Sequence, residues 1–257
     1  MNISEKLVEN HNFKPTDRTF QGQPTLATDN VELVYINVDS IHAAFIEKHF
    51  DASAIVFASR HRSETKTPTL TVHAPGNLTP QAIEGGRPSE VAATLPQRMK
   101  TALRVLEDGK TRLTSEYQVS LEVTHHGPTE MTTPVWFVEI GSSGKNWLDD
   151  DAGRLVADAI WTCTQEPPQG RSTVGFGGGH YAPKHTKRTL EEEYAVGHII
   201  PKYAIDGVDA QLIQQVFQKS GSECKTAILD WKGLAGNQRH RIIDLLRQIG
   251  VEDIVRA

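Results

Sequence analysis

The chain has 257 residues, and its content of 38% hydrophobic and 23% charged residues excludes wholesale disorder. No apolar run is long enough to cross a bilayer, and the N-terminus lacks the apolar core of a signal peptide, so we expect a cytoplasmic protein without membrane contact. The net charge of −5 excludes a uniformly basic nucleic-acid-binding surface, although local basic clusters permit an RNA substrate. Cys163 and Cys224, the only cysteines, argue against a disulfide framework and a cysteine-type zinc site.

Runs of β-forming residues alternate with amphipathic stretches along the chain. This pattern predicts one α/β domain over residues 1–257, with a mixed, mainly parallel sheet flanked by helices. A helix begins almost at residue 1, residues 11–30 form a loop or weak strand, and residues 75–96 make a long surface excursion. The predicted strands are 31–38, 54–58, 69–73, 117–124, 135–140, 173–176 and 227–230. The predicted helices are 41–49, 95–107, 147–162, 209–219 and 237–248.

A glycine-rich segment, TVGFGGGHYAPKH, covers residues 173–185 and follows a predicted strand. Glycine allows positive φ and close approach to a ligand, so the N–H groups of Gly177, Gly178 and Gly179 can form an anion-binding nest. His180 and Tyr181 follow directly and add groups capable of chemistry. The spacing matches neither a phosphate loop nor a full dinucleotide fingerprint. A plain tight turn is the alternative interpretation.

Further candidate residues lie in three other segments. In LEVTHHGP (121–128), strand alternation predicts that His125 and His126 face opposite sides, so that at most one enters a shared site. Glu139 lies inside the apolar strand FVEI, where an unpaired carboxylate is costly; a structural ion pair is the alternative to a site role. In the segment 59–77, His73 ends a strand, whereas His61 lies on a loop where solvation alone can explain it.

Several catalytic signatures are missing from the sequence. No serine fits the G-x-S-x-G elbow, no HExxH motif occurs, and neither cysteine has a recognisable nucleophile setting. A hydrolase with this sequence would therefore use water activated by histidine, carboxylate or metal. Histidine and carboxylate ligands suit Zn²⁺, although no spacing dictates it.

Three segments together resemble the archaeal- and plant-type D-aminoacyl-tRNA deacylases. They are SRHRSETKTPTLTVHAPGN, LEVTHHGPTEMTTPVWFVEIGSS and GFGGGHYAPKH, with AVGHIIPKYA as a fourth. The resemblance implies a zinc-associated hydrolase of phosphorylase/hydrolase-like fold that cleaves the ester of D-aminoacyl-tRNA. Family members open with a β-strand before the helix that matches residues 2–9, so we expect the start of this sequence to be placed too far downstream. The matching signature positions are His61, His73, His125, His126, Glu139, His180, Tyr181 and His198.

The resemblance does not itself assign roles to individual residues, and we propose the following roles as a hypothesis. The catalytic set is His180, Glu139, His73 and Tyr181, and the zinc ligands are His125, His126, His180 and Glu139. Substrate is bound by Gly177, Gly178 and Gly179, and by Lys184, Lys187 and Arg188, which contact tRNA phosphates. We expect a monomer. Two alternatives stay open: a zinc-dependent peptidase or amidohydrolase of similar fold, and a non-catalytic tRNA-binding protein.

Overall fold

The computed structural model describes residues 2–64 and 66–257. The helix expected almost at residue 1 is α1, which begins at Asn2 within the described residues. The elements in chain order are α1 (Asn2–Asn10), β1 (Lys14–Phe20), β2 (Gln23–Thr28), β3 (Val31–Leu33), the 3₁₀ helix η1 (Ser40–Lys48), β4 (Ile55–Arg60), β5 (Thr69–His73), β6 (Gly76–Asn77), β7 (Glu90–Val91), α2 (Pro96–Gly109), the 3₁₀ helix η2 (Lys110–Arg112), β8 (Gln118–Leu121), β9 (Val135–Gly141), α3 (Gly144–Trp147), α4 (Asp150–Gln165), β10 (Arg171–Phe176), α5 (Pro183–Glu191), β11 (Tyr194–Ile200), α6 (Ala210–Lys219), β12 (Thr226–Leu229), α7 (Gly236–Gln248) and β13 (Asp253–Arg256).

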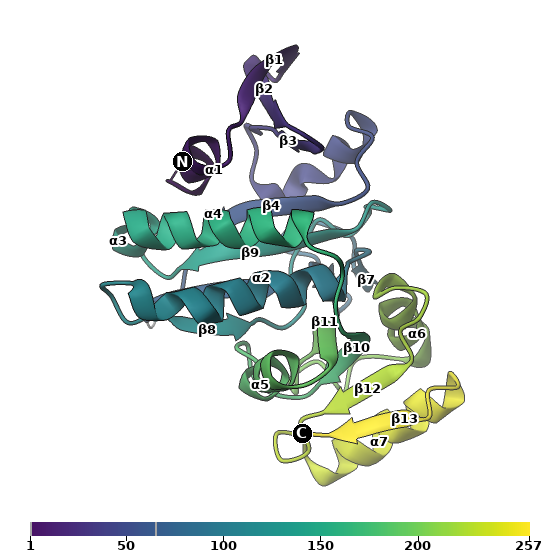
Figure 1. The fold of residues 1–257 in the computed structure, drawn as a ribbon. Coiled ribbons are helices and arrows are strands. Elements are labelled where there is room, and N and C mark those ends of the chain that lie inside the picture. Colours follow the sequence, from purple (N-terminus) through teal and green to yellow (C-terminus); the bar gives the residue numbers. More distant parts are fainter. Residues whose placement is uncertain (1, 65) are drawn as a thin grey trace.

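One mixed sheet of four strands has the order β4-β9-β5-β8. β4 runs parallel to β9, β9 antiparallel to β5, and β5 parallel to β8. One face of this sheet is apolar and packs on α2 and α4, which cover it in Figure 1. Leu70 and Val72 of β5 belong to this core, together with Leu103 of α2 and Val156 of α4. The opposite face carries Thr71, His73 and Glu139 beside a further hydrophobic cluster that includes Phe57, Val135 and Phe137.

A second sheet of four parallel strands has the order β11-β10-β12-β13. α2 contacts strands of both sheets, and one hydrophobic core contains residues from β5 of the mixed sheet and from β11 and β12 of the parallel sheet. Backbone hydrogen bonds also join the two sheets. The Val123 N–H donates to the His180 carbonyl, and the Ala182 N–H donates to the Leu121 carbonyl. The chain after β8 is thereby held against the chain after β10.

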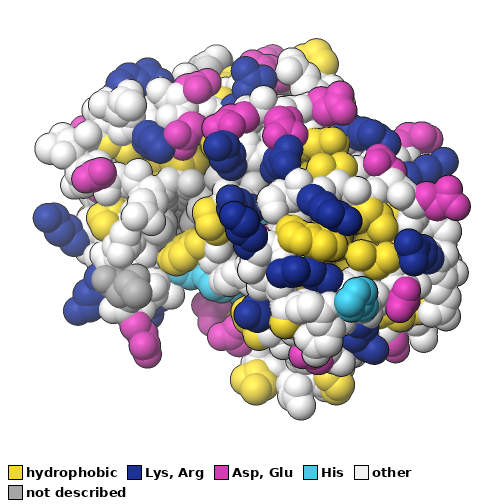
Figure 2. Space-filling model, turned by 90° about the horizontal axis from the view of Figure 1, so that it is seen from below, with side chains coloured by type: hydrophobic (Ala, Val, Ile, Leu, Met, Phe, Trp, Pro, Cys, Tyr) yellow, Lys and Arg dark blue, Asp and Glu magenta, His cyan; other side chains and the backbone are white. Residues whose placement is uncertain are grey.

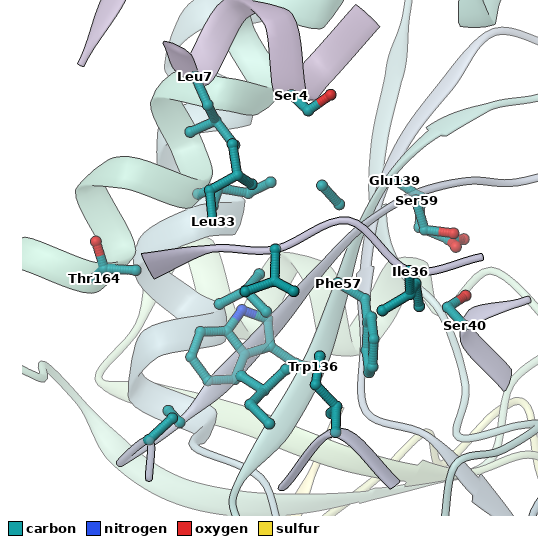
Figure 3. A pocket seen from close by; sticks show the side chains of 18 of the residues that line it. Ser4, Leu7, Leu33, Ile36, Ser40, Phe57, Ser59, Trp136, Glu139 and Thr164 are labelled. Atoms are coloured by element: carbon teal, nitrogen blue, oxygen red, sulfur yellow. The ribbon is translucent and has the colours of Figure 1, made fainter. Parts of the chain in front are cut away.

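A small antiparallel sheet, β1-β2-β3, projects from one end of the molecule (Figure 1). β4 pairs only with β9 within the described residues, so its other edge has no ladder partner there. A cavity of about 1480 Å³ extends along this edge. Figure 3 shows Ser4 and Leu7 of α1 on one side of the cavity, and Glu139 and Ser59 close together on another.

The predicted fold class, a mixed and mainly parallel α/β fold, is confirmed. All the predicted helices are present, the predicted 147–162 being divided between α3 and α4, and the predicted 41–49 being a 3₁₀ helix. The polar segment 11–30, predicted as a loop or a weak strand, contains the paired strands β1 and β2, which have few buried side chains. The strand predicted at 31–38 stops at Leu33, and the strands β11 and β13 and the helix α5 were missed. Of the predicted excursion, residues 75–78 and most of 91–96 are buried, so the exposed part is 79–90.

Candidate active site

The candidate site lies on the face of the mixed sheet opposite to α2 and α4. The register pairs Ser59 of β4 with Glu139 of β9, and Glu139 with Thr71 of β5. Since alternate residues of a strand face the same side, His73 shares this face, two positions after Thr71. All but Ser59 are buried. The alternate residues of β5 and β9, such as Leu70, Val72 and Val138, are buried in the core on the other face. Their burial holds these polar side chains in one row on this face.

Glu122 lies at the centre of the site, although no sequence prediction named it. Its side chain is fully buried, with 0% exposure. Four histidine nitrogens lie between 3.4 and 3.7 Å from its carboxylate oxygens. They are Nε2 of His180 at 3.4 Å, Nδ1 of His61 at 3.5 Å, Nε2 of His125 at 3.6 Å and Nδ1 of His73 at 3.7 Å. His61 follows β4, and His73 is the last residue of β5. His125 follows β8 and His180 follows β10, so the ends of four strands meet at one carboxylate.

The prediction that only one of His125 and His126 enters the site was wrong. Both rings lie against His73, with centroids 4.4 Å and 4.9 Å from it. Alternation fails because β8 ends at Leu121 and His126 adopts a positive φ of 47°. Nε2 of His126 and Nε2 of His73 are 3.2 Å apart.

His61, Tyr181 and Glu139 complete the cluster. The side chain of His61 is 11% exposed, and its Nδ1 lies 3.8 Å from Oε2 of Glu139. Its Nε2 lies 3.2 Å from the Tyr181 hydroxyl. His61 is therefore held on both ring nitrogens rather than solvated on a loop. The structure brings His61, His73, His125, His126, Glu139, His180 and Tyr181 together around Glu122.

Burial and neighbouring charges set the protonation of the cluster. Burial, reinforced by the surrounding histidines, lowers the pKa of His73 well below its ordinary value, and burial lowers the pKa of His126 to about 3. The contact with Glu122 raises the pKa of His180 despite burial. Burial would raise the pKa of Glu122, but the contact with His180 and the charges of His125 and His61 outweigh it and lower that pKa. Burial and the charge of Glu122 raise the pKa of Glu139 to about 8.

Several buried polar atoms of the cluster have no hydrogen-bond partner among the described residues. They are both carboxylate oxygens of Glu122, Nδ1 of His73 and Nε2 of His180. A buried carboxylate without hydrogen bonds costs several kcal/mol, and a cation bound between these atoms would offset that cost. Ligand atoms within 4.8 Å of one another occur in three groups: His73, His125 and His126; His61, Glu122 and His180; His73, Glu122 and Glu139.

Neutral imidazoles, such as those of His73 and His126, and an ionised carboxylate, such as that of Glu122, are donors that fit Zn²⁺. The four predicted ligands do not form one such group. His125 and His126 belong to the first group, His180 to the second and Glu139 to the third. His73 and Glu122 connect the groups.

The glycine loop approaches the cluster from β10. Gly177 and Gly178 have positive φ values of 94° and 88°, and a Cβ on Gly177 would meet Leu234 at 2.9 Å. The Gly177 N–H donates to the Ile200 carbonyl, so it cannot serve the oxyanion nest expected from the sequence. A Cβ on Gly179 would contact nothing within 4 Å, so this part of the loop is open to a ligand.

The predicted phosphate contacts lie on α5, directly after this loop. Lys184 and Lys187 are exposed, and Lys187 pairs with Glu191 at 3.7 Å. Arg188 pairs with Glu192 and donates to the Arg256 carbonyl. Surface pairs of this kind are weak, so they leave the cations able to meet a phosphate.

Sequence comparison identifies the family. The sequence model of the D-aminoacyl-tRNA deacylases matches residues 48–254. The chain belongs to the D-aminoacyl-tRNA deacylase family. The deacylase of Pyrococcus horikoshii is 37% identical, over 99% of this chain and 94% of the relative. The deacylase of Methanosarcina mazei is 38% identical, over 86% of this chain and 73% of the relative. A crystal structure of a conserved protein of unknown function matches with a TM-score of 0.90 at 30% identity, covering 99% of this chain and 90% of that one.

In this member of the deacylase family, His198 does not join the cluster, although it matched a signature position. It is fully buried; its Nε2 donates to the Ala92 carbonyl at 3.0 Å, and its Nδ1 lies 3.0 Å from the Thr124 hydroxyl. Because a carbonyl only accepts, Nε2 carries the proton and Nδ1 accepts from Thr124. Thr124 in turn accepts from the Ile199 N–H, which links the chain beside the cluster to β11. His198 thus supports the site from the core.

Burial lowers the pKa of His198 from 6.5 to about 4. The unfolded chain therefore binds a proton between these values that the folded chain does not bind, and the free energy of unfolding falls as pH falls from about 6.5 to 4. His198→Gln replaces the imidazole donor by an amide donor that cannot titrate. We therefore expect the variant to lose less free energy of unfolding between neutral and acidic pH, by up to about 3 kcal/mol. Urea denaturation of both proteins with chelator at pH 7.0 and 4.5 measures this difference. Equal losses in the two proteins would contradict the assignment.

Proposed function

We propose that this protein hydrolyses the ester between a D-amino acid and the 3′ end of tRNA. The observation that carries the proposal is the buried Glu122 with four histidines around it, in a chain of the D-aminoacyl-tRNA deacylase family. The relatives from Pyrococcus horikoshii and Methanosarcina mazei carry the name of this activity. Water attacks the ester carbonyl, the bond to the ribose oxygen breaks, and the products are the free amino acid and tRNA.

The same cluster supports zinc as the cofactor. Its unsatisfied nitrogen and oxygen atoms converge, and the low pKa values of His73 and His126 keep these rings neutral and able to bind a metal at neutral pH. Zinc bound there would lower the pKa of a bound water and polarise the ester carbonyl. Glu122 and His73 belong to two of the possible ligand groups each, so they would hold the ion together with His125, His126, His61, His180 or Glu139.

The accessible residues of the cluster have roles toward the substrate. The side chain of His180 is 39% exposed, whereas those of His125 and His61, which also contact Glu122, are 21% and 11% exposed. It therefore meets the ester first, as a metal ligand or as the base that takes a proton from water at Nε2. The Tyr181 hydroxyl, 3.2 Å from His61, fixes the ring of that histidine or donates to the substrate. The open Gly178–Gly179 backbone would approach the 3′ end.

The location of this activity follows from its substrate. No helix among the described residues has the length and apolarity to span a bilayer. Charged tRNA is a substrate of the cytoplasm, and we propose that the protein acts there as a monomer.

Release of labelled tyrosine from D- and L-tyrosyl-tRNA tests the function. We expect rapid hydrolysis of the D-ester and hydrolysis of the L-ester slower by about 100-fold or more, because the aminoacyl centre lies next to the reacting atoms. A protein that cleaves small peptides or amides but neither ester would instead be a metallopeptidase or amidohydrolase. Tight tRNA binding without turnover would identify a non-catalytic binding protein, although such a protein has no need of a buried histidine–carboxylate cluster.

A further inference from the structure

A cationic and aromatic surface lies at the end of the parallel sheet away from β11, around Trp231. The side chain of Trp231 is half-buried after β12, and two guanidinium groups lie against its ring. The Cζ atoms of Arg256 and Arg239 are 3.9 and 4.9 Å from the ring centroid. Figure 2 views the molecule from the α7 and β13 side and shows lysine and arginine side chains around a hydrophobic patch. None of these residues belongs to the Glu122 cluster.

A hollow of about 480 Å³ is part of this surface. Its walls combine flat or apolar groups, Trp231, Ile243 and Ile254, with the cations Arg247 and Arg256. Arg247 is 71% exposed, and its contact with Asp244 at 3.9 Å is between two exposed groups. Glu252 is the one acidic residue in the lining. We name this surface the Trp231 surface, defined by Trp231, Lys232, Ile243, Arg247, Ile254 and Arg256.

The charge of the Trp231 surface differs in sign from that of the whole chain. The protein carries a net charge of −5, whereas Lys232, Arg247 and Arg256 are exposed here together. Arg188 adds a further cation, because its guanidinium donates to the Arg256 carbonyl at 2.7 Å. A guanidinium plane stacked on an indole suits unstacked bases as well as phosphates. An acidic peptide would use the charge but not the flat stacked groups.

The Trp231 surface is continuous with the candidate active site through the glycine loop. Trp231 directly follows Asp230, and Oδ2 of Asp230 would lie 3.6 Å from a Cβ on Gly178. The Lys202 N–H donates to the Gly178 carbonyl, and the neighbouring Tyr203 is 68% exposed. Carboxyl ends of β10, β11 and β12 therefore form one edge, at which ligands of open parallel sheets bind. This edge runs from His180 to the Trp231 surface.

We infer that the Trp231 surface docks the RNA chain of the substrate outside its aminoacylated end, binding phosphates through its cations and a base on its guanidinium–indole stack. The inference rests on the proposed function for the identity of the RNA as tRNA. It adds contacts beyond Lys184, Lys187 and Arg188, and it assigns affinity for the tRNA body to a part of the protein that takes no part in the chemistry. A substrate without the tRNA body does not use these contacts.

The test compares a patch variant with a charge-matched control in the full-length protein. The patch variant carries Lys232→Gln, Arg247→Gln and Arg256→Gln. The control carries Lys14→Gln, Arg112→Gln and Lys225→Gln, which are exposed residues on β1, on η2 and at the amino end of β12. Binding of uncharged tRNA is followed by fluorescence anisotropy from 0.05 to 0.3 M salt. Turnover is measured on D-tyrosyl-tRNA and on D-tyrosyl-adenosine.

We expect the patch variant to bind uncharged tRNA about 10-fold more weakly near 0.1 M salt, with a salt slope of log Kd shallower by about 2 for three lost phosphate contacts. Its kcat/KM on D-tyrosyl-tRNA falls by a similar factor, through KM, while hydrolysis of D-tyrosyl-adenosine is unchanged. Wild-type affinity and slope in the patch variant, or an equal loss in the control, would overturn the inference. If the wild type binds tRNA through this surface but hydrolyses neither ester, the proposed function fails and the docking surface stands.

Discussion

Glu122→Gln is expected to lower turnover of D-tyrosyl-tRNA by about 1000-fold. The substitution keeps the size of the side chain but removes the negative charge that four histidine nitrogens approach within 3.7 Å. The amide also offers only one oxygen to a cation, whereas both carboxylate oxygens of Glu122 are unsatisfied. Single-turnover release of labelled tyrosine measures the loss. Glu116→Gln, an exposed residue outside the cluster, is the matched control and retains the wild-type rate.

A second readout separates a functional role of Glu122 from a structural one. In the metal-free protein the contacts with His180, His125 and His61 lower the pKa of Glu122, so the folded state favours its ionised carboxylate. A neutral amide at this position should therefore lower the thermal unfolding temperature while leaving the protein folded at the assay temperature. His180→Ala removes one of the four contacts from a partly exposed position, and we expect a smaller loss of about 100-fold. A Glu122→Gln protein that folds and turns over near the wild-type rate would remove Glu122 from the reaction.

Removal of zinc is expected to reduce turnover by about 1000-fold, and Zn²⁺ should restore it where Mg²⁺ does not. Most donors of the cluster are imidazole nitrogens, and only a few are carboxylates. Mg²⁺ prefers oxygen ligands and binds imidazole poorly. Dialysis against a chelator, followed by metal addition and the D-tyrosyl-tRNA assay, measures both steps. Full activity in protein shown to contain no metal would contradict the zinc proposal.

The fold was largely predictable where local pattern decides it. The helix α7 has an apolar face at helical spacing, the segment 135–140 is an almost continuous apolar run, and both elements were found where predicted. The segment 11–30 was predicted only as a loop or a weak strand, because most side chains of β1 are exposed, β2 buries only Thr25, and neither strand shows apolar alternation. The segment 31–38 has the composition of a strand, but only Val31 to Leu33 meet a partner strand, β2. Partner strands are a tertiary property that a single segment does not encode.

The candidate site was predictable in composition but not in geometry. His73, Glu139 and His180 were singled out by strand ends, glycines and an acid in an apolar strand. The same argument applies to Glu122, which lies between the apolar residues Leu121 and Val123 and shortly before a histidine pair. The central position of Glu122 depends on two backbone hydrogen bonds between distant segments, from the Val123 N–H to the His180 carbonyl and from the Ala182 N–H to the Leu121 carbonyl. His198 is the opposite case: it matches a signature motif, but its side chain is buried in the core and donates to the Ala92 carbonyl.

The most direct test of a metal-dependent hydrolytic centre at Glu122 is a zinc titration of metal-free protein. Bound zinc per chain and release of tyrosine from D-tyrosyl-tRNA are measured in the same samples, for the wild type and Glu122→Gln. We expect wild-type turnover to rise in proportion to bound zinc, and the variant to gain neither metal nor rate under the same conditions. Turnover independent of bound zinc, or full restoration of the variant, would contradict this expectation.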